Sequence, residues 1–146
     1  MIQGSVDIRS KREDDQNLLV KAQKKGYKLV FNRSQLAGAS GKVIGLFAGS
    51  AMPNAIAVSN ALKDPARSVP TLEEMAGKAI DILSQNDQGF FLMIEAGQID
   101  WASHSNDTGL LLHEMIQLND TVNAVLDWAE KREDTLIVLT ADHTTG

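Results

Sequence analysis

Residues 90–104, FFLMIEAGQIDWASH, decide the fold because an unbroken apolar run leads there into acidic residues and a histidine. Continuous apolar runs are typical of strands buried on both faces of a parallel sheet. Residues 135–143, TLIVLTADH, repeat the pattern near the C-terminus. If the two strands are parallel, their carboxyl ends meet at one edge of the sheet, where ligands gather in open α/β sheets. We therefore expect the chemistry of the chain at this edge.

A long helix is predicted between these two strands, over residues 107–132. Apolar residues recur there at helical spacing, namely at Leu111, Met115, Leu118, Val122, Val125, Leu126 and Ala129. The charged residues of the segment, Glu114 among them, are expected on its other faces. A helix between two buried strands is the crossover of a βαβ unit, so the pattern predicts an α/β fold.

The part before residue 90 is expected to be scaffold. Its patterns predict a helix, two short buried strands, an irregular surface or lid segment and a second helix, at residues 13–25, 27–31, 43–48, 49–68 and 71–84. Gly26 ends the first helix. Thr71 and Glu74 have the spacing of a capping box at the start of the second. Residues 1–146 are thus interpreted as one partial α/β domain.

Composition excludes several classes of function. The net charge is −5 and the pI is near 5.1, which argues against a nucleic-acid or anionic-membrane partner because both are polyanions. The chain has no cysteine, so a metal ion would need oxygen and imidazole ligands. No stretch approaches the roughly 20 apolar residues that cross a bilayer.

Five side chains of the ligand-forming type follow the two predicted strands: Glu95, Asp100, His104, Asp142 and His143. Asp100 and His104 are four residues apart, so they point the same way if the chain is helical there. Each of these groups also has a plainer interpretation. An Asp and a His four residues apart, such as Asp100 and His104, often form only a surface contact, and an Asp-His dipeptide such as Asp142-His143 is common in loops. If the two strands are parallel, however, all five side chains lie at one edge of the sheet. A metal site and the plainer interpretation therefore both remain possible interpretations.

The tryptophans and the remaining histidine are interpreted separately. Trp101 lies between two of the proposed ligands and is expected to line the site. Trp128 is expected to pack within the helix assembly. His113 lies away from the ligand-bearing turns and is expected to face solvent.

At residues 90–104 and 135–143 the sequence resembles the alkaline phosphatase family. FFLMIEAGQIDWASH is similar to the family's strand whose glutamate binds magnesium, followed by the aspartate and histidine of one zinc site. TLIVLTADH is similar to the strand that carries the aspartate and histidine of the other. The flanking segments NLLVKAQKKGY, GKVIGLFAGSAMP and VPTLEEMAGKAIDILSQNDQGFF occur in the family's order.

The resemblance implies a role for each candidate residue. Glu95 would bind one magnesium ion, Asp100 and His104 the first of two zinc ions, and Asp142 and His143 the second. Trp101 would lie near the phosphate or the magnesium. The implied fold is three-layer α/β/α with a mostly parallel sheet.

The implied activity is hydrolysis of phosphate monoesters through a phosphoserine intermediate, in a periplasmic or secreted protein. The family's nucleophilic serine in an Asp-Ser pair, its phosphate-binding arginine, its magnesium-binding threonine and a further zinc histidine have no counterpart in this chain. We therefore expect the 146-residue chain alone to be inactive and, with uncovered strand edges, to form a homodimer. A non-catalytic module with a residual metal or phosphate site, and a purely structural piece without metal, are the alternatives.

Overall fold

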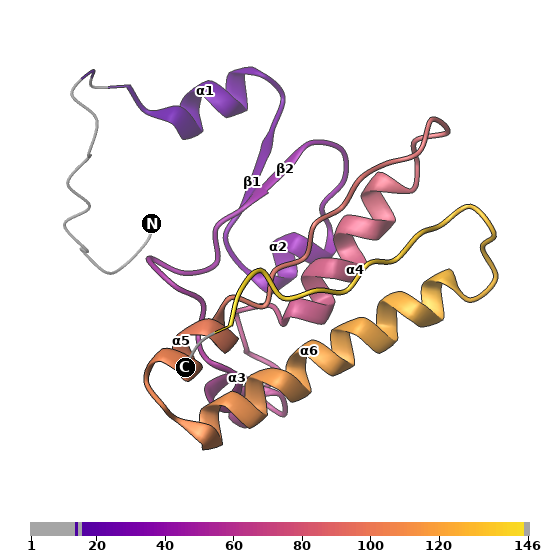
Figure 1. Cartoon of the computed structure of the whole chain (residues 1–146). Coiled ribbons are helices and arrows are strands. Elements are labelled where there is room, and N and C mark those ends of the chain that lie inside the picture. Colours follow the sequence, from indigo (N-terminus) through magenta and orange to yellow (C-terminus); the bar gives the residue numbers. More distant parts are fainter. Residues whose placement is uncertain (1–13, 15, 145–146) are drawn as a thin grey trace.

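The computed structural model describes residue 14 and residues 16–144, and its regular elements are helices and one small parallel sheet (Figure 1). The elements in chain order are α1 (Leu18–Lys24), β1 (Lys28–Val30), α2 (Arg33–Ala37), β2 (Val43–Gly45), α3 (Ala55–Ala61), α4 (Leu72–Leu83), α5 (Gln98–His104) and α6 (Thr108–Ala129). Strands β1 and β2 pair in parallel, with Leu29 opposite Ile44. The described chain is therefore helix-rich α/β, with two strands at the expected places.

The two long helices begin where the sequence predicts. At α4, the Thr71 Oγ1 accepts a hydrogen bond from the Glu74 amide at 3.1 Å, and a Glu74 carboxylate oxygen accepts one from the Thr71 amide at 2.9 Å. This confirms the capping box. At α6, the Asp107 side chain accepts from the Leu110 amide at 2.9 Å. Both helices are thus fixed by local sequence.

The first helix is shorter than expected. Helix α1 begins at Leu18, because the Asn17 side chain accepts hydrogen bonds from the Leu19 and Val20 amides. Gly26 ends this segment with a φ of +85°, a backbone conformation that favours glycine. Residues 13 and 15, which the prediction included, lie outside the described part of the chain.

Two short helices were not predicted. Helix α3 lies inside residues 49–68, which the sequence indicated to be irregular, so that prediction is wrong for its seven residues. Asn54 caps α3 by accepting from the Ala57 amide at 2.9 Å. Helix α2 is capped likewise by Asn32. Such short helices carry too few turns to show an apolar period, and only their caps are visible in the sequence.

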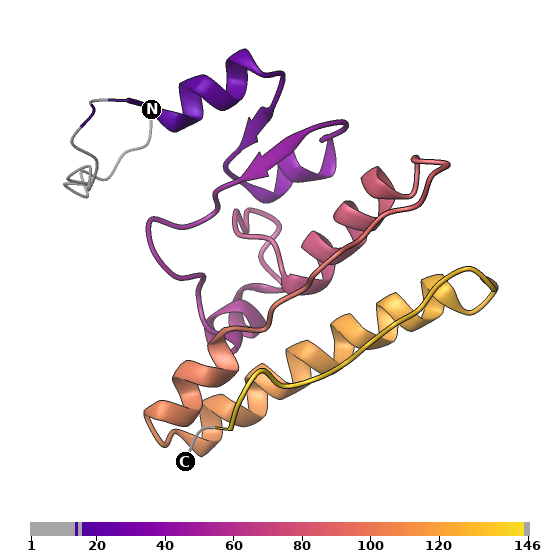
Figure 2. The same cartoon turned by 45° about the horizontal axis from the view of Figure 1, so that its top comes forward.

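The predicted strands at residues 90–96 and 135–140 do not form. A strand requires backbone hydrogen bonds to a neighbour, and in the described part of the chain the sheet contains only β1 and β2. Residues 91–97 nevertheless alternate between exposed and half-buried positions, as an extended chain does. In Figures 1 and 2 the first segment runs beside α4, and the second runs back along α6 towards α5.

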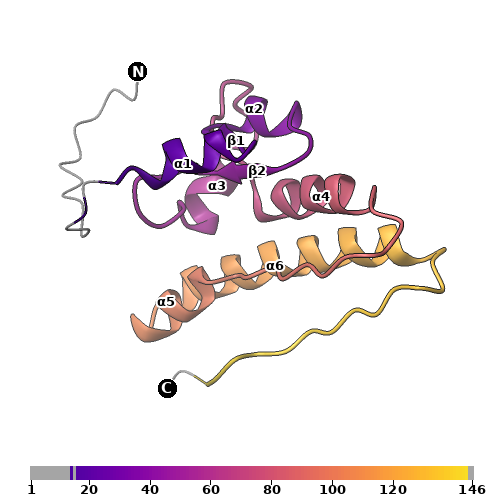
Figure 3. The same cartoon turned by 90° about the horizontal axis from the view of Figure 1, so that it is seen from above.

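Helix α6 is the element against which the ligand-bearing region packs. It contacts α4, α5 and α3 (Figure 3). Glu114 of α6 is only 3% exposed, although the sequence placed it on a polar face. One of its carboxylate oxygens accepts a hydrogen bond from the Ala55 amide at 2.6 Å, so it holds the start of α3. Met115 and Leu126 are half exposed instead of lying in the expected apolar stripe.

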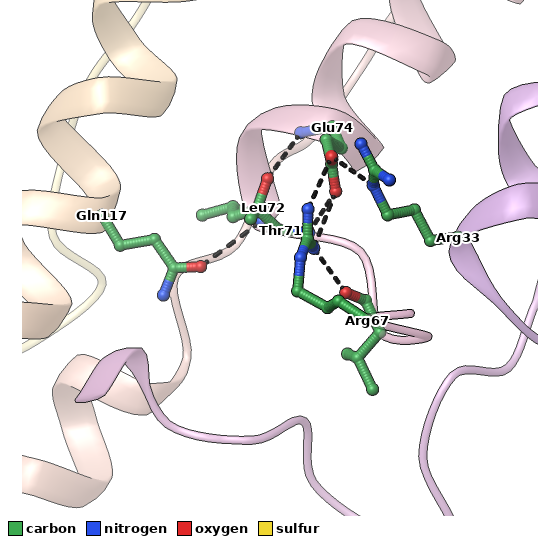
Figure 4. A network of polar contacts seen from close by, with 7 residues as sticks. Arg33, Arg67, Thr71, Leu72, Glu74 and Gln117 are labelled. Carbon is green, nitrogen blue, oxygen red and sulfur yellow. Dashed lines mark hydrogen bonds and ion pairs between the residues drawn. The ribbon is translucent and has the colours of Figure 1, made fainter. Parts of the chain in front are cut away.

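A polar network fastens α4 to its neighbours (Figure 4). The Glu74 carboxylate accepts from Arg33 Nε at 2.7 Å and from both terminal nitrogens of Arg67, at 2.9 and 3.1 Å. Arg67 also donates to the Val69 carbonyl at 2.6 Å. Burial alone would raise the pKa of Glu74, but Arg67, the Thr71 amide and Arg33 lower it to about 2. The carboxylate is therefore charged and fully partnered.

A small apolar core lies beside α2 and α4. The buried side chains of Val30, Leu36 and Ala39 form it, with Val43, Phe47 and Met75 packed against them. The core thus joins both strands to α2 and α4, and the ligand-bearing residues lie outside it.

Candidate active site

Helix α5 carries two of the proposed ligands and is held firmly in place. Ala102 on α5 is completely buried, and α5 packs against α6. At its first residue, the Gln98 side chain donates to the Met52 carbonyl at 2.8 Å. A contact across so many residues leaves no trace in the local sequence, so sequence reasoning missed Gln98.

Asp100 and His104 lie one turn apart on α5, as predicted. The Asp100 Oδ1 and the His104 Nε2 are 3.4 Å apart. The Asp100 side chain is 35% exposed, and His104 is more open to solvent. The helical spacing therefore brings a carboxylate and an imidazole together on one face.

The C-terminal segment delivers the second pair to the same place. The His143 Nε2 lies 3.6 Å from the Asp100 Oδ1 and 3.4 Å from the Asp142 Oδ2. Residues 135–143 thus end beside α5 even though they form no strand. Four of the five proposed ligands come together, namely Asp100, His104, Asp142 and His143.

Asp100 is the electrostatic centre of this group. Its Oδ1 is buried and is the one buried side-chain polar atom in the described chain without a hydrogen-bond partner. Two imidazole nitrogens approach it, but neither is a hydrogen-bond partner in this arrangement. Withholding a carboxylate oxygen from water is unfavourable unless a donor or a cation compensates. The site therefore has a place for a positive charge.

Glu95 and Trp101 lie at the margin of the group. Glu95 is exposed in the extended segment and takes no part in the ion pairs that join the other four ligands in the described chain. A Cβ atom on Gly97 would come within 3.2 Å of the Glu95 Oε1, so this glycine leaves room for the carboxylate. Trp101 is 58% exposed on α5.

The other two predictions about aromatic residues are confirmed. His113 is exposed, and its Nδ1 lies 2.8 Å from the Gly109 carbonyl of its own helix. Trp128 packs against Phe90, with ring centroids 6.1 Å apart, and Arg132 lies over its ring at 4.0 Å. Neither residue belongs to the site.

Comparison with known proteins identifies the family. The model of the alkaline phosphatase family matches residues 3–146. The chain belongs to the alkaline phosphatase family. Alkaline phosphatase 3 of Bacillus subtilis is 39% identical over 133 residues, which are 90% of this chain and 27% of that protein. The chain thus spans less than a third of this relative.

Solved alkaline phosphatases share the fold. The cold-active enzyme of a psychrophilic Shewanella has a TM-score of 0.78 and 36% identity, over 88% of this chain and 31% of its own. A variant of the enzyme from the Antarctic bacterium TAB5, with Mg bound in its M3 site, has a TM-score of 0.62 and 26% identity, over 83% of this chain and 33% of its own. Among the described residues, no helix combines the length and apolarity that a membrane crossing needs.

The donor atoms of this alkaline phosphatase chain fit zinc in pairs. With bonds of about 2.0–2.1 Å, two ligands of a tetrahedral zinc ion lie roughly 3.3 Å apart. The pairs Asp100–His104 and Asp142–His143 are both separated by 3.4 Å. In the described part of the chain no three His, Asp or Glu side chains converge as a complete metal site. Each pair therefore fits two corners of a tetrahedron, and further ligands are needed to close it.

Proposed function

We propose that the chain provides part of the metal centre of a phosphate monoester hydrolase. Asp100 and His104 would hold one zinc ion, Asp142 and His143 a second, and Glu95 a magnesium ion. The observation that carries the proposal is the buried, unpartnered Asp100 Oδ1 with two imidazole nitrogens 3.4 and 3.6 Å away. A carboxylate oxygen and two imidazole nitrogens placed in this way can bind a cation, and a bound cation would compensate the buried charge.

The chain's own residues would position the metal ligands. Gln98 and the buried Ala102 fix α5, so Asp100 and His104 keep their common direction. Gly97 leaves the Glu95 carboxylate free to turn towards a cation. Two bound zinc ions would polarise the phosphoryl group and steady its attacking and leaving oxygens. Trp101, exposed beside Asp100, would lie near the substrate.

The covalent step needs residues outside this chain. No Asp-Ser pair occurs in the 146 residues, so the serine that would form the phosphoserine intermediate is supplied elsewhere. Zinc with two protein ligands is also expected to bind more weakly than zinc with three or four. We therefore expect no steady hydrolysis of p-nitrophenyl phosphate by the zinc-loaded chain alone.

A chimera tests the proposal directly. This chain would replace the matched 27% of the B. subtilis alkaline phosphatase 3, and hydrolysis of p-nitrophenyl phosphate would be measured with zinc and magnesium. We expect hydrolysis that falls at least a hundredfold in Asp100→Asn and His143→Ala, because each change removes one of few zinc ligands. His113→Ala is the matched control and should retain activity. Equal activity of the His143→Ala chimera would contradict the proposal.

A non-catalytic module with a residual metal site is the second candidate. The observation that favours it is that, among the described residues, the side chains that come together are not placed so that three of them could hold one metal ion. The same chimera distinguishes the two, since a folded chimera that binds zinc without hydrolysing the ester would favour the module. The three-layer α/β/α arrangement and a periplasmic or secreted location are part of the proposal for the whole protein.

A further inference from the structure

Helix α5 carries Asp100 and His104, but its own sequence does not fix where it begins. It has only seven residues, and its N-cap residue, Gly97, makes no side-chain hydrogen bond. The other described helices all begin with a side-chain cap, at Asn17, Asn32, Asn54, Thr71 and Asp107. Helices as short as α5 are marginal in isolation, so contacts with other parts of the chain must hold it.

The Gln98 side chain holds the uncapped end of α5. Gln98 is the first residue of the helix, and its Nε2 donates a hydrogen bond to the Met52 carbonyl at 2.8 Å. Further along, Ala102 is completely buried, and α5 packs against α6. The position of the first turn of α5 therefore depends on where the Met52 carbonyl lies.

Residues 52–55, with the sequence MPNA, join this carbonyl to the start of α3, and we call them the link. The proline ring fixes the backbone φ angle at Pro53. The next residue, Asn54, caps α3 with its side chain, so its conformation is restricted as well. A restraint on the Ala55 amide is therefore transmitted to the Met52 carbonyl through a short and stiff piece of backbone.

Glu114 of α6 supplies the restraint on Ala55. Its side chain is buried, and its Oε1 accepts a hydrogen bond from the Ala55 amide at 2.6 Å. Its Oε2 accepts a longer hydrogen bond, of 3.4 Å, from Gln117 Nε2. The Gln117 Oε1 in turn accepts from the Leu72 amide at the start of α4, also at 3.4 Å (Figure 4). Both oxygens of the buried carboxylate thus have partners, as burial of a charge requires.

We propose that Glu114 and Gln98 are positioning residues for the ligand pair Asp100 and His104, and that Glu114 acts on α5 through the link. The inference rests on the proposed function, because it concerns the same ligands. The Asp100 Oδ1 and the His143 Nε2 lie 3.6 Å apart but belong to different segments, so a shift of α5 changes their separation. Metal sites need their ligands within about 0.5 Å of the productive geometry.

A purely structural role of Glu114 is the competing explanation. In that case Glu114 stabilises only the start of α3, and α5 is held by its packing against α6. Figure 3 shows that α3 and α5 both lie towards the start of α6, so the two explanations use the same neighbours. They differ in whether Glu114 and Gln98 act on α5 through one connection, which the link provides.

Hydrogen exchange of the full chain in EDTA tests this connection without any metal ion. The amides of residues 102–105, in the last turn of α5, should exchange about tenfold faster in Gln98→Ala and in Glu114→Met. Both substitutions interrupt the same connection, so the double variant should exchange at most about threefold faster than the faster single variant. Unchanged exchange in Gln98→Ala would overturn the proposal. A double variant that shows the product of the two single effects would also overturn it.

Control variants separate position from stability. Glu114→Gln keeps an acceptor for the Ala55 amide, so the α5 amides should exchange less than about threefold faster, although the hydrogen bond loses its charge. Asn32→Ala removes the cap of α2, a comparable loss of stability in a helix that packs against α4. It should leave the α5 amides unchanged. If Asn32→Ala accelerates them as much as Gln98→Ala does, the effect is one of global stability and the proposal is wrong.

The Ala55 amide provides a second measurement, which decides the matter if Glu114→Met does not fold. Coupling between two sites is reciprocal. Gln98→Ala should therefore also accelerate exchange of the Ala55 amide, which Glu114 protects from the other end of the link. An Ala55 amide that exchanges equally in the native chain and in Gln98→Ala would overturn the proposal.

The chimera with B. subtilis alkaline phosphatase 3 measures the consequence for the reaction. Gln98→Ala should lower kcat for p-nitrophenyl phosphate about tenfold and change KM less than about threefold, because a displaced ligand helix affects the transition state more than substrate binding. An equal kcat in Gln98→Ala and in the native chimera would overturn the positioning role. If the native chimera does not hydrolyse the ester while the exchange results hold, only the proposed function fails.

Discussion

The carboxylates of Glu74 and Asp100 differ in their hydrogen-bond partners. Glu74 accepts hydrogen bonds from Arg33, Arg67 and the Thr71 amide, and its pKa falls to about 2. The Asp100 Oδ1 is buried without any hydrogen-bond partner, beside two imidazoles. The Glu74 carboxylate thus finds all these hydrogen-bond partners within the chain itself. The Asp100 Oδ1 has no such partner in the described part of the chain, which agrees with its proposed role as a metal ligand.

The same contrast extends to the surroundings. Around Glu74 the helix cap and the two arginines form one polar network (Figure 4), and Met75 of the same helix packs against the apolar core. Around Asp100, two extended apolar segments end with most of their outward side chains exposed. Substitutions in the first region should therefore affect stability, whereas substitutions at Asp100 should affect binding.

The largest stability effect is expected for Glu74→Ala. The substitution leaves the Arg67 guanidinium, whose side chain is only 9% exposed, without its carboxylate and removes half of the capping box. We expect a loss of about 3 kcal/mol in the free energy of unfolding, measured by urea denaturation. Glu73→Ala on the same turn is the control and should lose less than about 0.5 kcal/mol. Equal losses in the two variants would show that the network does not stabilise the chain.

Glu114→Gln should have a smaller effect. The Glu114 carboxylate is buried and accepts from the Ala55 amide, so a neutral acceptor keeps the shape but weakens a charge-assisted hydrogen bond. We expect a loss of about 1–2 kcal/mol by urea denaturation. Glu130→Gln, at an exposed residue just after α6, should change stability by less than about 0.5 kcal/mol. An unfolding free energy that is unchanged in Glu114→Gln would mean that the stability of α3 does not depend on this contact.

Acid should weaken the Glu74 region selectively. The pKa of Glu74 is lowered from 4.5 to about 2 on folding, so its stabilisation is present above pH 4.5 and is lost as the pH falls towards 2. Allowing for solvent screening of its partly exposed side chain, about 1–2 kcal/mol should disappear in this range. The difference in unfolding free energy between the native chain and Glu74→Gln should shrink accordingly. A difference that stays constant from pH 6 to pH 2.5 would contradict this assignment.

The smallest stability effect is expected for Asp100→Asn. Without a metal ion, this substitution removes a charge from a buried oxygen that has no hydrogen-bond partner. We expect the unfolding free energy in EDTA to change by less than about 0.5 kcal/mol, or to rise slightly. A loss as large as that of Glu74→Ala would mean that Asp100 is a structural residue.

The sequence predicted contacts between residues that are close in the chain, and it missed contacts between residues that are far apart in the chain. The capping box of Thr71 and Glu74 and the turn that joins Asp100 to His104 are local, and both predictions are confirmed. The arginine partners of Glu74 lie 41 and 7 residues away, so no local pattern reveals them.

Burial and strand pairing explain the wrong predictions. A charged residue on a helix normally faces solvent, so the burial of Glu114 against Ala55 was not foreseen. The apolar runs at residues 90–96 and 135–140 have the composition of strands, but pairing requires neighbours that the described chain does not supply. The sequence also predicted that the two segments bring Asp100 and His143 together, and these side chains lie 3.6 Å apart, although the parallel strands on which the prediction rested do not form in the described chain.

Zinc titration of the chain by calorimetry shows directly whether Asp100 and its neighbours bind metal. We expect zinc binding that weakens at least tenfold in Asp100→Asn and in His143→Ala, with no change in Asp81→Asn, an exposed carboxylate on α4. An equal zinc affinity of the native chain and of Asp100→Asn would mean that Asp100 is not a zinc ligand.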